Sequence, residues 1–218
     1  MNNLKSAIVL FGLLAFGVPA QAIINPFIRA GVDFSKLNGL SSLQSNDSWK
    51  DKLNGWNAGY FAEAGITFLG SHILAVEAGY MKANGSVGAN EAGVTSREQI
   101  PLLLNYRHSF NLGPASLYLG LSAGMMSDTA NWREDAQEAG ESWKNFKGAN
   151  WVGLYGATAG VGLKLGKGWG VDVGVRALAV SGKQYEAGVL SDAEHSYGIG
   201  SSKVYVRPNV RLALSHQW

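Results

Sequence analysis

From residue 28 onward, apolar and polar side chains alternate with a period of two, and this alternation limits the fold more than any other feature of the chain. A period of two indicates β-strands that turn one face toward apolar surroundings. The C-terminal stretch is the clearest case, with Val206, Val210, Leu212 and Leu214 on one face and Arg207, Asn209 and Arg211 on the other. The sequence predicts eight such strands, within residues 28–35, 56–68, 74–80, 99–110, 116–124, 151–165, 171–177 and 203–215.

The connections between the expected strands alternate between short and long. Residues 70–72, 111–114 and 166–168 are short turns, whereas 38–54, 84–94, 127–150 and 182–200 are long polar loops. Short turns at one end and long loops at the other are typical of outer-membrane barrels. We therefore expect an all-β fold: an eight-stranded antiparallel transmembrane β-barrel in the bacterial outer membrane, with short periplasmic turns and long extracellular loops.

The first 22 residues have the pattern of a secretory signal peptide. Lys5 precedes an apolar run at 7–16, and Ala20-Gln21-Ala22 forms a small-residue cleavage box. The apolar run is shorter than the roughly 18–20 residues of a spanning helix. The expected organisation is a signal peptide at 1–22 and a barrel at 23–218.

The polar face of the strands carries many charges. If that face met lipid, each basic residue near the midplane would cost about 2–4 kcal/mol. Several such residues together would exceed the roughly 5–15 kcal/mol by which a domain is stable. The lumen of an eight-stranded barrel is only wide enough for side chains. We therefore expect a network of ion pairs inside it, with a proton relay or narrow pore as the alternative; the network comprises Arg29, Asp33, Glu63, Glu77, Arg107, Asp172, Arg176, Arg207 and Arg211.

Aromatic residues gather near the ends of the expected strands. Aromatic girdles of this kind mark the two membrane interfaces. The residues that we assign to them are Phe27, Trp56, Tyr60, Phe68, Tyr80, Tyr106, Phe110, Trp151, Trp169 and Trp218.

Two stretches carry a resemblance to a known group. Ile100-Pro101-Leu102-Leu103-Leu104-Asn105-Tyr106-Arg107 is similar to the fourth strand of the opacity-like outer membrane protein β-barrels, and the last strand ends in Trp218. In architecture the chain resembles the OmpA/OmpX-type small barrels over its whole mature length. The resemblance implies outer-membrane lipid and lipopolysaccharide as surroundings, and Trp218 as the signal for the barrel assembly machinery. His216 departs from the family, which usually has Tyr or another bulky apolar residue there.

Composition argues against several functions. The net charge is only +2, with no strong basic patch, so nucleic acid is not an expected partner. Cysteine is absent, which excludes disulfides, thiolate metal sites and cysteine catalysis. No cofactor or metal is expected.

The four histidines give little sign of catalysis. His72 falls in an expected periplasmic turn, and His108 and His216 fall near the periplasmic ends of strands. Only His195 is in an extracellular loop, beside Ser191, Asp192, Glu194 and Ser196, and neighbours in a polar loop more often form a solvated tip. We expect a protein that is not an enzyme, with a lipid-modifying enzyme or protease as the less favoured alternative.

The remaining candidates for function are in the long loops. Trp49 is in the first, and Trp132, Arg133, Trp143 and Lys144 are in the third. Such aromatic residues either dip to the lipid headgroups or form a recognition surface, since loops on a rigid scaffold carry function. The favoured hypothesis is a structural outer-membrane protein whose loops bind a host or cell-surface ligand; a porin-like narrow pore is the alternative.

Overall fold

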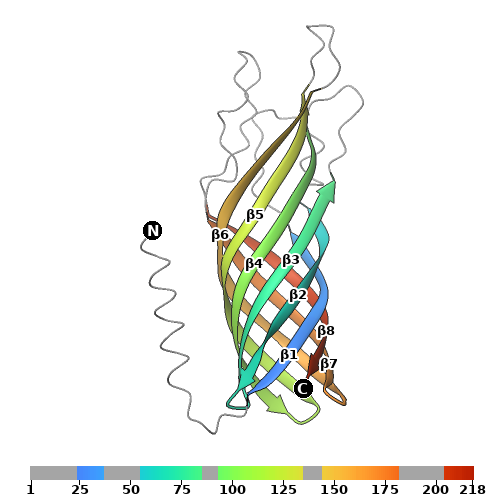
Figure 1. The fold of residues 1–218 in the computed structure, drawn as a ribbon, viewed down its shortest axis with the longest axis vertical. Coiled ribbons are helices and arrows are strands. Elements are labelled where there is room, and N and C mark those ends of the chain that lie inside the picture. Colours follow the sequence, from blue (N-terminus) through green and yellow to red (C-terminus); the bar gives the residue numbers. More distant parts are fainter. Residues whose placement is uncertain (1–23, 37–54, 85–92, 135–143, 182–203) are drawn as a thin grey trace.

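The computed structural model describes residues 24–36, 55–84, 93–134, 144–181 and 204–218. They form eight strands that pair antiparallel in sequence order, and β1 pairs with β8 to close the barrel (Figure 1). The strands are β1 (Asn25–Lys36), β2 (Trp56–Phe68), β3 (His72–Asn84), β4 (Gly93–Leu112), β5 (Ala115–Glu134), β6 (Lys144–Gly166), β7 (Trp169–Ser181) and β8 (Tyr205–Gln217). The all-β barrel predicted from the alternation is confirmed.

Three tight turns connect the strands at one end of the barrel. Leu69 and Gly70 both have positive φ (51° and 72°), as do Lys167 and Gly168 (50° and 79°). Consecutive positive φ values are the geometry of the hairpin turns that match the twist of paired strands. The start of β1 and the C-terminus lie at this same end (Figure 1). We call it the periplasmic end, because short turns lie there in outer-membrane barrels.

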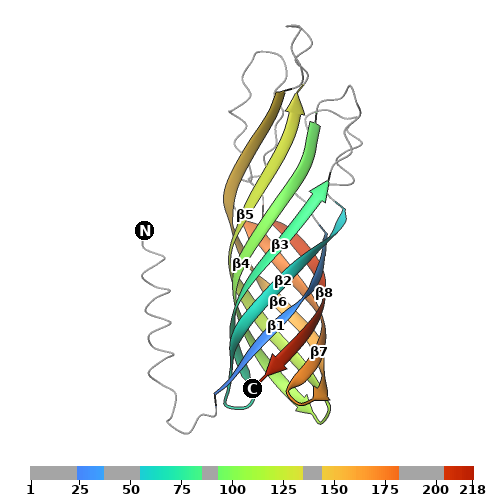
Figure 2. The same cartoon turned by 45° about the vertical axis from the view of Figure 1, so that its right-hand side comes forward.

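Strands β4, β5 and β6 extend well beyond the others at the opposite, extracellular end. They have 20, 20 and 23 residues, whereas the remaining strands have 12 or 13. Figure 2 shows them rising as a wall on one side. The predicted loop at 127–150 is therefore wrong in part, because β5 and β6 stay paired as far as Glu134 and Lys144. The extension lacks the apolar alternation that predicts a strand.

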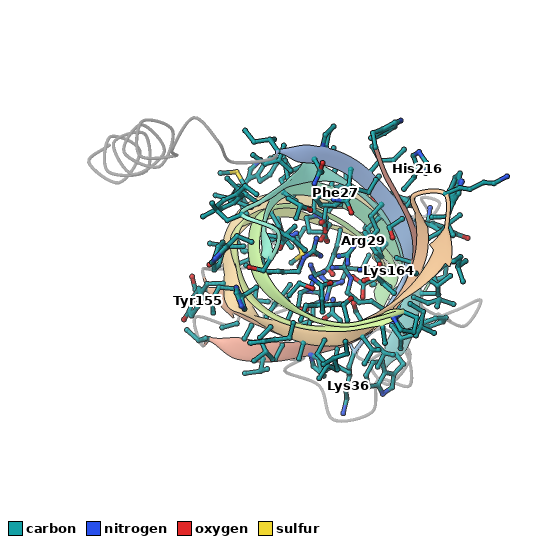
Figure 3. All side chains as sticks on the ribbon, turned by 90° about the horizontal axis from the view of Figure 1, so that it is seen from below. Phe27, Arg29, Lys36, Tyr155, Lys164 and His216 are labelled. Atoms are coloured by element: carbon teal, nitrogen blue, oxygen red, sulfur yellow. The ribbon has the colours of Figure 1, made fainter. Side chains whose placement is uncertain are left out.

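The exterior of the barrel is apolar. Leu121 and Val76 are 64% and 62% exposed, and large apolar side chains of every strand join them. Viewed along the barrel, Arg29 points into the lumen, whereas Tyr155 and Lys36 point outward (Figure 3). The assignment of Phe27 to an aromatic girdle is wrong, since this residue is buried. Phe27 is two residues from Arg29 in β1, so its side chain points to the same inward face although it lies near the end of the strand.

None of the described residues forms a helix of the length and apolarity needed to cross a bilayer. The expected signal peptide at 1–22 lies outside the described residues.

Candidate functional site

The lumen holds three clusters of polar side chains. The lower cluster, nearest the periplasmic end, comprises Arg29, Glu63, Arg107 and Asp172. Arg29 Nη2 donates to Glu63 Oε2 at 2.8 Å, and both terminal nitrogens of Arg107 bind the same carboxylate. Arg29 Nη1 also lies 3.5 Å from Asp172 Oδ1. Two carboxylates thus offset two guanidiniums.

The central cluster comprises Asp33, Glu77, Arg176 and Arg211. Arg176 Nη1 donates to both oxygens of Glu77, at 2.9 and 3.1 Å, and Arg211 Nη1 donates to Glu77 Oε2 at 3.0 Å. Arg176 Nη2 donates to Asp33 Oδ2 at 3.0 Å. Asn105 Nδ2 links the two clusters, since it lies 2.9 Å from Glu77 Oε2 and 3.4 Å from Glu63 Oε2. Such buried charges are tolerated only because they are paired and hydrogen-bonded.

Aromatic rings pack against the guanidiniums of these clusters. The guanidinium carbon Cζ of Arg211 lies 3.6 Å from the ring centroid of Phe61, and Cζ of Arg29 lies 5.6 Å from the same centroid. Cζ of Arg107 lies within 6 Å of the ring centroids of Phe27 and Tyr118. Rings in these positions add cation–π attraction and exclude water from the ion pairs.

The upper cluster, toward the extracellular end, comprises Arg97, Gln99, Asp128 and Arg207. Arg97 donates to both oxygens of Asp128, at 3.0 and 2.5 Å. Gln99 joins Asp128 to Arg207, because its Nε2 donates to Asp128 and its Oε1 accepts from Arg207 Nη1 at 2.8 Å. Arg207 also contacts the sulfur of Met126.

A cluster of buried apolar side chains adjoins the upper polar cluster, since Met126 contacts Arg207 and Leu178 is opposite Arg207 in the register. We call it the apolar cluster. Its members come from β4, β5, β6 and β7 and are at most 2% exposed: Leu103, Met126, Val152, Leu154, Leu178 and Val180.

The lumen opens at the periplasmic mouth into a cavity of about 330 Å³. Arg29, Arg107 and Tyr118 line its inner end.

All nine residues that the sequence selected for the lumen do face it. Eight lie in the lower and central clusters, whereas Arg207 belongs to the upper cluster. Sequence reasoning missed Arg97 and Asp128, because it assigned the region of Asp128 to a loop and began the fourth strand at 99. It also missed the apolar cluster, although the inward phase of Leu103 and Leu178 could have indicated it.

The extracellular candidates are placed differently from the prediction. Trp132 and Arg133 belong to β5 and Lys144 begins β6, so these three residues are on paired strands instead of in a loop. The register sets Trp132 opposite Phe146 and Glu134 opposite Lys144. Trp49 and Trp143 lie outside the described residues.

Trp218 follows the last strand at the periplasmic end. Its backbone N–H donates to Pro26 O at 3.2 Å, and its side chain is 63% exposed. The ring contacts His216 edge-on at 5.0 Å. The C-terminus is therefore attached to β1 at the seam that closes the barrel.

The three described histidines lie at the periplasmic end. His72, predicted in a turn, is instead the first residue of β3, and it contacts His108 on β4. His195 lies outside the described residues. Within the part of the chain that the structure describes, no group of three or more His, Cys, Asp or Glu could hold a metal ion.

Comparison with solved structures places this geometry among known barrels. The crystal structure of Neisserial surface protein A matches with a TM-score of 0.54 and 11% identity, over 90% of this chain and 99% of that chain. Ail, the attachment invasion locus protein of Yersinia pestis, matches with a TM-score of 0.51 and 10% identity, over 89% and 98%. Ail in complex with the heparin analogue sucrose octasulfate gives 0.50 and 9%, over 89% and 99%. No protein-family model and no curated protein sequence matches the chain.

At such low identity these similarities concern the fold alone. The fold is that of the small eight-stranded outer-membrane barrels, as the resemblance to the OmpA/OmpX type predicted. Its apolar exterior would be unfavourable in water and is favourable in lipid. The chain is an outer-membrane barrel of a bacterium.

Proposed function

We propose that this protein is a non-enzymatic outer-membrane barrel whose extended strands β4–β6 present a recognition surface outside the cell. The observation that carries the proposal is the unequal length of the strands. The last residue of β6 that pairs with β7 is Gly153, so the nine residues Lys144–Val152 continue beyond that neighbour. At roughly 3.3 Å per residue, they extend about 30 Å along the strand.

The projecting segments have a composition suited to binding. The β5–β6 hairpin carries the bases Arg133, Lys144 and Lys147 together with Trp132 and Phe146. It also carries four acids: Glu134 is opposite Lys144 in the register, and Asp135, Glu138 and Glu141 fall within the connection at 135–143, whereas the bases are on the paired strands. Cations and aromatic residues together suit anionic carbohydrate, because the cations attract sulfate and the rings pack on sugars. The Ail structure contains a heparin analogue. We therefore infer that the ligand class for this chain is a sulfated glycan of a host or neighbouring cell surface.

The lumen supports a non-conducting barrel. Buried ion pairs lie at three levels of the described lumen, and the apolar cluster packs beside the upper one. An ion that passed through would have to displace these paired charges, which is costly. This cost argues against the hypothesis of a narrow pore.

The positions of the histidines argue against an enzyme. A lipid-modifying or proteolytic barrel would act at the extracellular rim, whereas the described histidines lie at the periplasmic end.

We also propose two partners that the sequence led us to expect. Outer-membrane lipid and lipopolysaccharide would surround the apolar exterior. The barrel assembly machinery would recognise the last strand, which is followed by Trp218.

Shortening the hairpin tests the proposal. Ala130 and Gly148 are opposite each other in the register, so residues 131–147 can be replaced by an Asn-Gly turn. We expect this variant to fold, with the changed gel mobility of an unheated barrel, and to lose binding to immobilised heparin and to sucrose octasulfate.

Charge variants refine the test. The triple variant Arg133→Ala, Lys144→Ala, Lys147→Ala should weaken binding, whereas Lys164→Ala, Lys167→Ala at the periplasmic end should leave it unchanged. Equal binding by the wild type and the shortened variant would show that the wall is not the binding surface. Failure of the wild type to bind either probe would overturn the assignment of a sulfated glycan.

A further inference from the structure

Two histidine rings face each other across neighbouring strands at the periplasmic end. His72 begins β3, and His108 lies opposite it on β4 in the register. The centroids of the two rings are 4.8 Å apart, and their planes meet at 63°. Both side chains are partly exposed. His108 has the same phase along β4 as the outward-facing Tyr106 and Leu104, so the pair lies on the outer surface near the membrane interface.

Neighbouring aromatic residues hold both rings in place. Phe68 stacks on His72 with centroids 5.4 Å apart, and Phe110 meets His108 edge-on at 4.7 Å. The hydroxyl of Tyr106 lies 2.7 Å from His72 Nδ1. When Nδ1 carries the proton and donates it to this hydroxyl, the lone pair of His72 Nε2 is free to bind an ion. A hydrogen bond of this kind is what usually orients a histidine ligand of a metal.

The distance between the rings fits shared coordination of one ion. With metal–nitrogen bonds of about 2.0–2.1 Å, two imidazoles in adjacent positions on one ion have centroids roughly 5 Å apart. The observed 4.8 Å is already at that separation. The strands would therefore not need to move, and with His72 held by Tyr106, rotation of the His108 ring would aim one of its nitrogens at an ion on His72 Nε2.

We propose that His72 and His108 form a two-histidine site for a divalent transition-metal ion, Zn²⁺ or Cu²⁺, on the periplasmic rim of the barrel. Imidazole suits both ions, and Cu²⁺ binds more tightly than Zn²⁺ to a given set of ligands. The protein supplies two ligands, and water or phosphate oxygens fill the other positions. Tyr106 is a positioning residue that fixes the ring of His72.

Titration of the folded protein with each metal alone tests the site. Untagged protein in a maltoside detergent contains no phosphate and no added histidines. We expect one ion per chain by calorimetry with Zn²⁺, and an electron paramagnetic resonance spectrum of two equatorial nitrogens with Cu²⁺. His72→Gln or His108→Gln should weaken binding about tenfold or more, and Tyr106→Phe should weaken it without changing the stoichiometry.

His216 provides the matched control. It is also at the periplasmic end, with Trp169 and Trp218 at 4.7 and 5.0 Å, but no histidine is opposite it in the register. His216→Gln should keep the wild-type affinity. Gel mobility of the unheated variants confirms that each has folded. A wild-type spectrum without two nitrogens, or unchanged binding in the His72→Gln, His108→Gln double variant, would overturn the proposal.

Discussion

Neutralising Glu77 should destabilise the barrel more than removal of any exposed charge. The Glu77 carboxylate is 1% exposed and accepts hydrogen bonds from Arg176, Arg211 and Asn105. In Glu77→Gln, Arg176 keeps Asp33 at 3.0 Å, but the nearest remaining contact of Arg211 with a carboxylate is Asp33 at 3.9 Å. Breaking a buried ion pair in this way costs about 3–5 kcal/mol, because one charge stays buried without its partner.

The measurement is the free energy of unfolding by urea in detergent micelles, followed by tryptophan fluorescence. Glu98→Gln is the matched control, since it breaks an ion pair with Lys82 at 3.0 Å. In that pair the side chain of Glu98 is 31% exposed and that of Lys82 is 44% exposed. That change should cost only about 0–1 kcal/mol. Glu77→Gln combined with Arg211→Met should recover much of the loss, because removing both partners of a buried pair is often neutral. A cost for Glu77→Gln no larger than that of the control would refute the idea of a dry, tightly paired lumen.

Three further outcomes follow from the same structure. Leu121→Arg on the lipid face should cost about 2–4 kcal/mol, whereas Leu112→Arg beside a periplasmic turn should cost about 0–1 kcal/mol, as measured by the same unfolding assay. Folded protein in planar bilayers should give no conductance steps, because buried ion pairs occupy the lumen at three levels; steady single-channel steps would contradict this. A Cβ at Gly174 would lie 2.4 Å from the Tyr118 hydroxyl, with Ala159 O at 3.1 Å and Tyr118 Cζ at 3.4 Å. Tyr118→Phe should therefore restore most of the stability lost in Gly174→Ala but not that lost in Gly160→Ala, where a Cβ would also lie 2.4 Å from Cζ and 2.6 Å from Val173 O. Equal rescue of both variants would contradict this difference.

The sequence predicted the strands in the part of the barrel that faces lipid. A strand between hydrocarbon and a packed polar lumen must alternate apolar and polar side chains. The strands expected at 56–68 and 151–165 accordingly fall inside β2 and β6. The extensions of β5 and β6 were not predicted, because Ser127–Glu134 is mostly polar and lacks the alternation that indicates a lipid-facing strand. Backbone pairing with a neighbour keeps these residues in strands, and pairing leaves little trace in a sequence.

The lumen was predictable in composition but not in arrangement. Alternation identified Glu63, Glu77 and their arginines as inward-facing, since charges of this number could not face hydrocarbon. Which arginine binds which carboxylate depends on tilt and closure: Glu77 and Arg176 are 99 residues apart in the chain. The pairing of His72 with His108 was hidden for the same reason, because it is set by the register of β3 and β4.

The distribution of constraints along the barrel argues for recognition at the extracellular wall. Every level of the described lumen carries contacts that a transport route would have to break, and the exterior is constrained by lipid. The upper cluster with Arg97, Gln99 and Asp128 already lies above the last pairing of β6 with β7. Beyond that cluster, residues 132–134 and 144–146 meet neither requirement, so these residues can change without loss of the barrel. A ligand-binding surface needs this freedom, together with the support of a rigid base. Continuous pairing of β5 and β6 from Ala115 to Glu134 provides that support, since it joins the wall to the barrel without an intervening hinge.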